Sequence, residues 1–105
     1  MIIIKGKKYD YLLMNSFFKK MFGVMFMKKN NYLFLFENKK EKKIAIHSFF
    51  CYPLFLYFFD KEKKLIEKVK LKPFRIYFPK KRWKYLIESF KELDINENER
   101  FVLDN

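Results

Sequence analysis

The sequence predicts a single small α+β domain, in which a mainly antiparallel set of strands is combined with one or two short helices. The chain has 105 residues and half of them are hydrophobic, which suffices for one core. Two strand-like stretches flank a charged turn near the middle of the chain, and a short segment with a helix-capping residue precedes them. A disordered tail and a membrane-spanning bundle are both excluded, because 22% of the residues are aromatic and 34% are charged.

The N-terminal third predicts a hairpin followed by a helix. Residues 2–5 and 9–14 are β-prone and flank a turn signal at Gly6. A helix of about two turns is expected over residues 17–22, because the hydroxyl of Ser16 can accept hydrogen bonds from amides of the first turn.

The middle third predicts the centre of the sheet. Residues 32–37 and 43–48 read as strands on either side of a charged, solvated loop at residues 38–42. Residues 53–59 are apolar on both faces, as a central strand would be, and a turn leads from them to a strand at residues 65–71.

The C-terminal third allows two interpretations. Residues 74–78 predict an irregular stretch or a short edge strand. The apolar positions in residues 80–93 fit one amphipathic helix, and they fit equally a strand followed by a short helix that begins at Ser89. In the second interpretation residues 101–103 form a last strand. Periodicity does not decide between the two.

Several local features occur in an order that resembles a known family. The landmarks are Lys20-Met21-Phe22-Gly23-Val24-Met25, Phe34-Leu35-Phe36, His47-Ser48-Phe49-Phe50, Pro53-Leu54 with Phe59-Asp60, Leu71-Lys72-Pro73-Phe74-Arg75 and Tyr85-Leu86-Ile87-Glu88. Over residues 12–104 they resemble the uncharacterised family known as domain of unknown function 192. The resemblance implies an α+β domain with a curved antiparallel sheet or a partly open barrel. It favours a strand followed by a short helix in residues 80–93, and it implies no activity.

The chain departs from that family pattern at several positions, including the C-terminal turns, where Asn96-Glu97-Asn98-Glu99 replaces a Gly-rich stretch. Phe55 stands where the pattern has an acidic residue, Cys51 stands where it has Met, and Lys20 stands where Arg is usual. If the family has a chemical site around the acidic residue, the resemblance implies that this chain has lost it.

Few residues suit catalysis or metal binding. His47 is the only histidine and Cys51 the only cysteine, so an intramolecular disulfide is excluded and no histidine pair or cysteine pair is available for a metal. Cys51 lies in an apolar run, where a free cysteine behaves as a small buried hydrophobe. No phosphate-binding glycine loop and no nucleophile elbow occur. We therefore expect no cofactor, and a non-catalytic protein rather than an enzyme.

Glu88 is the most notable polar residue, because it lies among apolar neighbours and a buried unpaired carboxylate is unfavourable. It either faces solvent or pairs with a cation such as Lys20 or Arg75. His47 either packs at the surface or contacts a ligand. The first hypothesis is a site for an unknown small ligand or protein partner, built from His47, Arg75, Glu88 and Lys20.

A basic tract provides the alternative hypothesis. The chain has 24 Lys and Arg against 12 Asp and Glu, a formal charge of +12. The tract has no acid and contains Lys70, Lys72, Arg75, Lys80, Lys81, Arg82 and Lys84, interleaved with Phe74, Tyr77, Phe78 and Trp83. Cations bind phosphates and exposed rings stack on single-stranded bases, which predicts sequence-tolerant nucleic-acid binding. One alternative is a merely solvated surface, because Lys is also abundant elsewhere in the chain. Another is a membrane surface or an acidic protein as partner.

The remaining expectations concern the compartment. The N-terminus lacks a signal-peptide core, and the longest apolar run, residues 49–59, is interrupted by Pro53 and is shorter than the roughly 20 residues of a spanning helix. We therefore expect a cytoplasmic protein with no transmembrane segment. The ligand and the oligomeric state do not follow from the sequence.

Overall fold

The structure, a computed structural model, describes residues 1–14, 32–48, 53–73 and 75–104. All regular secondary structure in this part of the chain is β-strand, and no helix that could cross a membrane occurs in it. The strands are β1 (Ile2–Ile4), β2 (Lys7–Tyr9), β3 (Tyr11–Leu13), β4 (Leu33–Lys42), β5 (Ile46–Ser48), β6 (Leu54–Phe59), β7 (Leu65–Leu71), β8 (Arg75–Tyr77), β9 (Trp83–Ser89) and β10 (Val102–Leu103).

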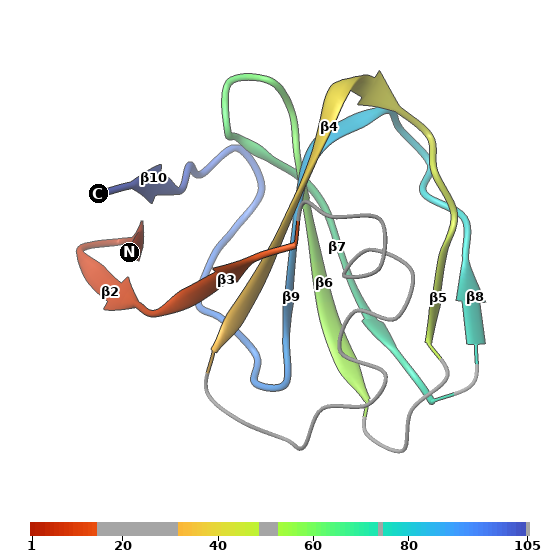
Figure 1. The fold of residues 1–105 in the computed structure, drawn as a ribbon, viewed down its shortest axis with the longest axis horizontal. Helices are drawn as coiled ribbons and strands as arrows, with labels where there is room; N and C mark the ends of the chain where they lie inside the picture. Colours follow the sequence, from red (N-terminus) through yellow and green to blue (C-terminus); the bar gives the residue numbers. More distant parts are fainter. Residues whose placement is uncertain (15–31, 49–52, 74, 105) are drawn as a thin grey trace.

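A five-stranded sheet in the order β3-β4-β9-β6-β7 forms the centre of the molecule (Figure 1). Strand β3 runs parallel to β4, and the other neighbours are antiparallel. Ile87 of β9 lies opposite Leu35 of β4 on one side and Tyr57 of β6 on the other. Strands β6 and β9 are interior strands with apolar residues on both faces. The sheet therefore has one hydrophobic core on each face.

The first core lies on the face of Phe34, Phe58 and Leu86, and a two-stranded ribbon of β5 and β8 packs against it. The ring of Tyr77 from β8 stacks on Phe58, with 5.9 Å between ring centroids. Ile46, opposite Tyr77 on β5, also packs against this core. The ribbon is therefore held by its inward-facing apolar residues.

The second core lies on the opposite face and is closed by the small sheet β10-β1-β2. Ile2 and Ile4 of β1 are buried in it, and the ring of Phe101 lies 4.6 Å from that of Phe59. The turn between β1 and β2 places Lys5 and Gly6 at positive φ angles of 51° and 77°. This is the left-handed pair that a tight hairpin needs, and it confirms the predicted turn.

The predicted α+β class is corrected for the described residues, which are all β. The predicted helix at residues 17–22 lies outside them. One helix over residues 80–93 is wrong, since Trp83–Ser89 is strand β9, and a short helix after Ser89 is also wrong. The hydroxyl of Tyr57 accepts a hydrogen bond of 2.7 Å from the Leu93 amide, which draws this segment onto the sheet in a non-helical path.

Most predicted strands are confirmed, and two boundaries are corrected. The predicted second hairpin strand is split, because β2 pairs with β1 while β3 leaves it to pair with β4. The predicted loop at residues 38–42 belongs to β4. Buried Asn38 donates to the carbonyl oxygen of Trp83 at 3.2 Å, so this polar stretch is tied to β9.

Candidate functional site

The residues of the first hypothesis lie on different elements. His47 is on β5, where its backbone pairs with Ile76, and Arg75 is exposed on β8 of the same ribbon. Glu88 is on β9 of the five-stranded sheet, and Lys20 lies outside the described residues. The ribbon thus brings His47 and Arg75 onto neighbouring strands, and their grouping with Glu88 stays a prediction.

Glu88 is a buried carboxyl group in the first core. Only 5% of it is exposed, and it lies in register between Phe34 of β4 and Leu56 of β6. Burial away from water raises its pKa to about 8. Glu88 is therefore mostly protonated and neutral at pH 7.

The basic tract divides between buried and exposed positions. Trp83 is 2% exposed, and its indole Nε1 donates to the carbonyl oxygen of Ile44 at 3.4 Å. The ammonium group of Lys84 bonds the Asn38 and Lys39 carbonyl oxygens and lies 3.4 Å from a carboxylate oxygen of Glu37. These two members of the tract therefore stabilise the junction of β4 and β9.

The other cations of the tract are exposed and do not share one face. Arg75, Lys80, Lys81 and Arg82 lie on or beside the ribbon that covers the first core, and Lys72 lies between β7 and β8. Lys70 of β7 instead lies opposite Phe55, whose ring packs against the second core. Nucleic-acid binding by residues 70–84 stays a prediction.

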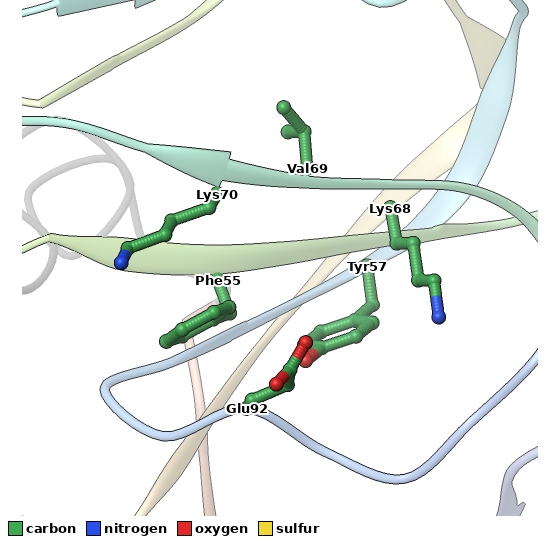
Figure 2. A pocket seen from close by; sticks show the side chains of 6 residues that line it. All are labelled: Phe55, Tyr57, Lys68, Val69, Lys70 and Glu92. Atoms are coloured by element: carbon green, nitrogen blue, oxygen red, sulfur yellow. The ribbon is translucent and has the colours of Figure 1, made fainter.

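A hollow of about 440 Å³ opens on the side of the second core, and Figure 2 shows it from close by. It is called the Phe55 groove here, and its lining comes from β6, β7 and the segment after β9. The lining residues are Phe55, Tyr57, Lys68, Val69, Lys70 and Glu92. The side chains of Lys68 and Lys70 flank the two rings, and Glu92 faces them from the other side (Figure 2).

Strand register assembles the Phe55 groove. Lys70 pairs with Phe55 and Lys68 pairs with Tyr57 across β6 and β7, so each cation stands beside an aromatic ring on the same face. The ammonium nitrogen of Lys70 lies 5.6 Å from the centroid of the Phe55 ring, within cation–π range. The Lys68 ammonium donates to the Ile95 carbonyl oxygen at 3.1 Å. This bond holds Lys68 at the rim of the groove.

Glu92 supplies the acidic side of the groove, close to Tyr57. The Tyr57 hydroxyl is fixed by the Leu93 amide, and burial, with the nearby Glu92 charge, raises the pKa of this phenol. A second hollow, of about 270 Å³, also includes Glu92 and is lined further by Lys7, Tyr9 and Lys91. Cationic and aromatic side chains therefore occur on both sides of Glu92.

Sequence reasoning named only Lys70 among the lining residues of the groove. Phe55 was noted only as a departure from the family pattern, and Lys68 was not singled out. The contribution of Glu92 depends on a non-helical segment that was expected to be a helix. No group of His, Cys, Asp and Glu that could hold a metal ion occurs in the described part of the chain.

Comparison with known proteins identifies the family. No family model matches the sequence. A UPF0127 protein of Pyrococcus horikoshii is 38% identical over 78 residues, which cover 71% of this chain and 67% of that protein. A UPF0127 protein of Pyrococcus furiosus is 30% identical over 92 residues, covering 83% of this chain and 78% of that one. The chain belongs to the UPF0127 family. This is the uncharacterised family, domain of unknown function 192, that the sequence landmarks resemble.

Solved structures support the same fold. A candidate transcription regulator of Sinorhizobium meliloti superposes with a TM-score of 0.81 at 14% identity, over 96% of this chain and 88% of that one. A protein of unknown function from Novosphingobium aromaticivorans superposes with a TM-score of 0.80 at 11% identity, over 90% of this chain and 75% of that one. At these identities the likeness concerns the fold alone.

Proposed function

We propose that this UPF0127 protein is a non-catalytic binding domain and that the Phe55 groove is its ligand site. The observation that carries the proposal is the pairing of two ammonium groups with two aromatic rings on one face of the β6–β7 hairpin. Ligand sites are concave and combine apolar surface with placed polar groups, and the groove combines two aromatic residues and Val69 with three charged side chains.

The chemistry of the groove selects an anionic small molecule with a flat apolar portion. Lys70 supplies an exposed ammonium, and Lys68 keeps two donors after its bond to the Ile95 carbonyl oxygen. The half-buried Phe55 offers a ring against which a flat group can pack. Glu92 accepts hydrogen bonds and so favours a ligand that also carries a donor.

Adenosine 5′-monophosphate is a suitable probe because it combines a flat ring, an anionic group and hydrogen-bond donors. Isothermal titration calorimetry of the full chain with this nucleotide should give a saturable isotherm. Lys70→Gln should weaken binding by about tenfold, since a hydrogen bond to a charged group is worth roughly 1.5–3 kcal/mol. Phe55→Ala should weaken binding of the nucleotide but not of inorganic phosphate.

Lys61→Gln is the matched control, because it removes the same charge at the turn, at the far end of the β6–β7 hairpin from the Phe55–Lys70 pair. The affinity of this variant for adenosine 5′-monophosphate should equal that of the wild type. The proposal fails if the wild type gives no isotherm, or if Lys61→Gln and Lys70→Gln weaken binding equally.

A further inference from the structure

The β5–β8 ribbon exposes apolar side chains that the core does not use. Ile76 is 57% exposed, Phe78 is 72% exposed and Ile44 is 42% exposed. Ile76 belongs to β8 and Phe78 follows it, whereas Ile44 precedes β5, and the Ile46–Tyr77 pair brings these two stretches of chain side by side. Single exposed apolar residues are ordinary, but a cluster of this kind marks an interaction surface.

The direction of Ile76 and Phe78 follows from strand alternation. Tyr77 points inward, where its ring stacks on Phe58. Ile76 and Phe78, on either side of Tyr77 in sequence, therefore point to the opposite face of the ribbon. Pro79 is buried directly after Phe78 and helps to fix this geometry. The ribbon thus presents apolar side chains outward from a supported backbone.

Cations border this face. Lys80, Lys81 and Arg82 are exposed and follow Phe78 and Pro79 directly, and the sequence has no Asp or Glu between residues 68 and 87. The carboxylate of Glu67 approaches from β7, where one oxygen accepts from the Lys80 amide at 3.0 Å and the other is buried. Glu67 is thus directed into the molecule. The ribbon patch is defined as Ile44, Ile76, Phe78, Lys80, Lys81 and Arg82.

We infer that the ribbon patch binds the surface of an anionic lipid bilayer. Exposed apolar side chains enter the headgroup region, and bordering cations bind lipid phosphates, in the way that peripheral proteins attach to membranes. Charge complementarity specifies the partner, since the exposed charges of the patch are all positive. The groups involved are separate from the Phe55 groove, so this inference does not depend on the proposed ligand.

Lipid fits the ribbon patch better than single-stranded nucleic acid does. Sequence-tolerant binding of single strands needs exposed rings on which bases stack. Trp83 is buried and Tyr77 is stacked on Phe58, which leaves Phe78 as the exposed ring of the described tract. The other apolar members of the patch are isoleucines, which enter a bilayer interface but do not stack on bases.

Co-sedimentation with large unilamellar vesicles tests this inference. The full chain should bind vesicles of phosphatidylcholine with phosphatidylglycerol and should not bind phosphatidylcholine alone. Ile76→Ser combined with Phe78→Ser should lower the partition coefficient about tenfold at constant charge. Lys80→Gln, Lys81→Gln and Arg82→Gln together should lower it by at least as much, and raised salt should lower it further.

Two control variants distinguish binding through the ribbon patch from nonspecific adsorption to the vesicles. Val102→Ser removes an apolar side chain that is 54% exposed on β10, at the other end of the molecule from the ribbon (Figure 1). Lys7→Gln with Lys8→Gln removes exposed charge from β2. Both should bind vesicles like the wild type, and thermal unfolding confirms that all variants fold. The inference is overturned if the wild type does not sediment, if the controls lose as much binding as the patch variants, or if a single-stranded oligonucleotide displaces the protein from the vesicles.

Discussion

At the scale of single residues, Glu88 is the most unusual group in the described structure. An acid whose pKa rises from 4.5 to about 8 in the folded state binds a proton more tightly when folded than when unfolded. Its contribution to stability is therefore greatest below pH 4.5 and is lost as the pH rises toward 8. Between pH 4.5 and pH 8, the titration of Glu88 should lower the free energy of unfolding by about 1.4 kcal/mol for each pH unit.

Glu88→Gln should remove this pH dependence of the free energy of unfolding, because the amide has a similar shape and does not titrate. Urea unfolding at pH 5, 6, 7 and 8 should show the variant gaining stability relative to wild type at each step. Glu97→Gln, at an exposed position, should follow the wild type throughout. Parallel pH profiles for wild type and Glu88→Gln would show that the buried carboxyl does not titrate as described.

At the scale of elements, the segment after β9 completes the second core and borders the Phe55 groove. Phe101 is 1% exposed and packs edge-to-face on Phe59 and Tyr85, with centroids 4.6 and 5.5 Å apart. Its amide donates to the Lys63 carbonyl oxygen at 3.1 Å, which ties the segment to the β6–β7 turn. The packing of Phe101 thus adds to the Tyr57–Leu93 and Lys68–Ile95 hydrogen bonds that hold the earlier part of this segment.

Phe101→Ala should lower the free energy of unfolding by about 3–5 kcal/mol, the range for removing a buried aromatic ring. The neighbouring Val102→Ala should change it by no more than about 0.5 kcal/mol, because Val102 is 54% exposed. Chemical unfolding of both variants measures the difference. Equal losses would mean that Phe101 does not anchor the segment.

The strands of the central sheet were predictable, whereas the elements around them were less so. Runs such as residues 53–59 and 65–71 carry their own pattern of apolar residues, and the structure confirms both. The path after Ser89 was not predictable, because the Leu93 amide is held by Tyr57 from a strand distant in sequence. The Phe55 groove was missed for the same reason, since Glu92 joins its lining only through the path of this segment.

At the scale of the whole molecule, one sheet separates two surfaces with different chemistry. The side of the first core carries the ribbon patch, where exposed apolar residues border cations. The side of the second core carries the Phe55 groove, where cations are paired with rings and faced by Glu92. The basic tract, continuous in sequence, is therefore divided in space, with Lys70 in the Phe55 groove and Lys80, Lys81 and Arg82 on the ribbon patch.

The measurement that tests the central claim most directly is a ¹H–¹⁵N correlation titration of the full chain with adenosine 5′-monophosphate. The account predicts saturable shifts of the amide signals of Phe55, Tyr57, Lys68 and Lys70, with the signals of Ile76 and Tyr77 unmoved. Shifts confined to the ribbon or to the neighbours of Glu88, or no saturable shift at all, would contradict the assignment of the Phe55 groove as the ligand site.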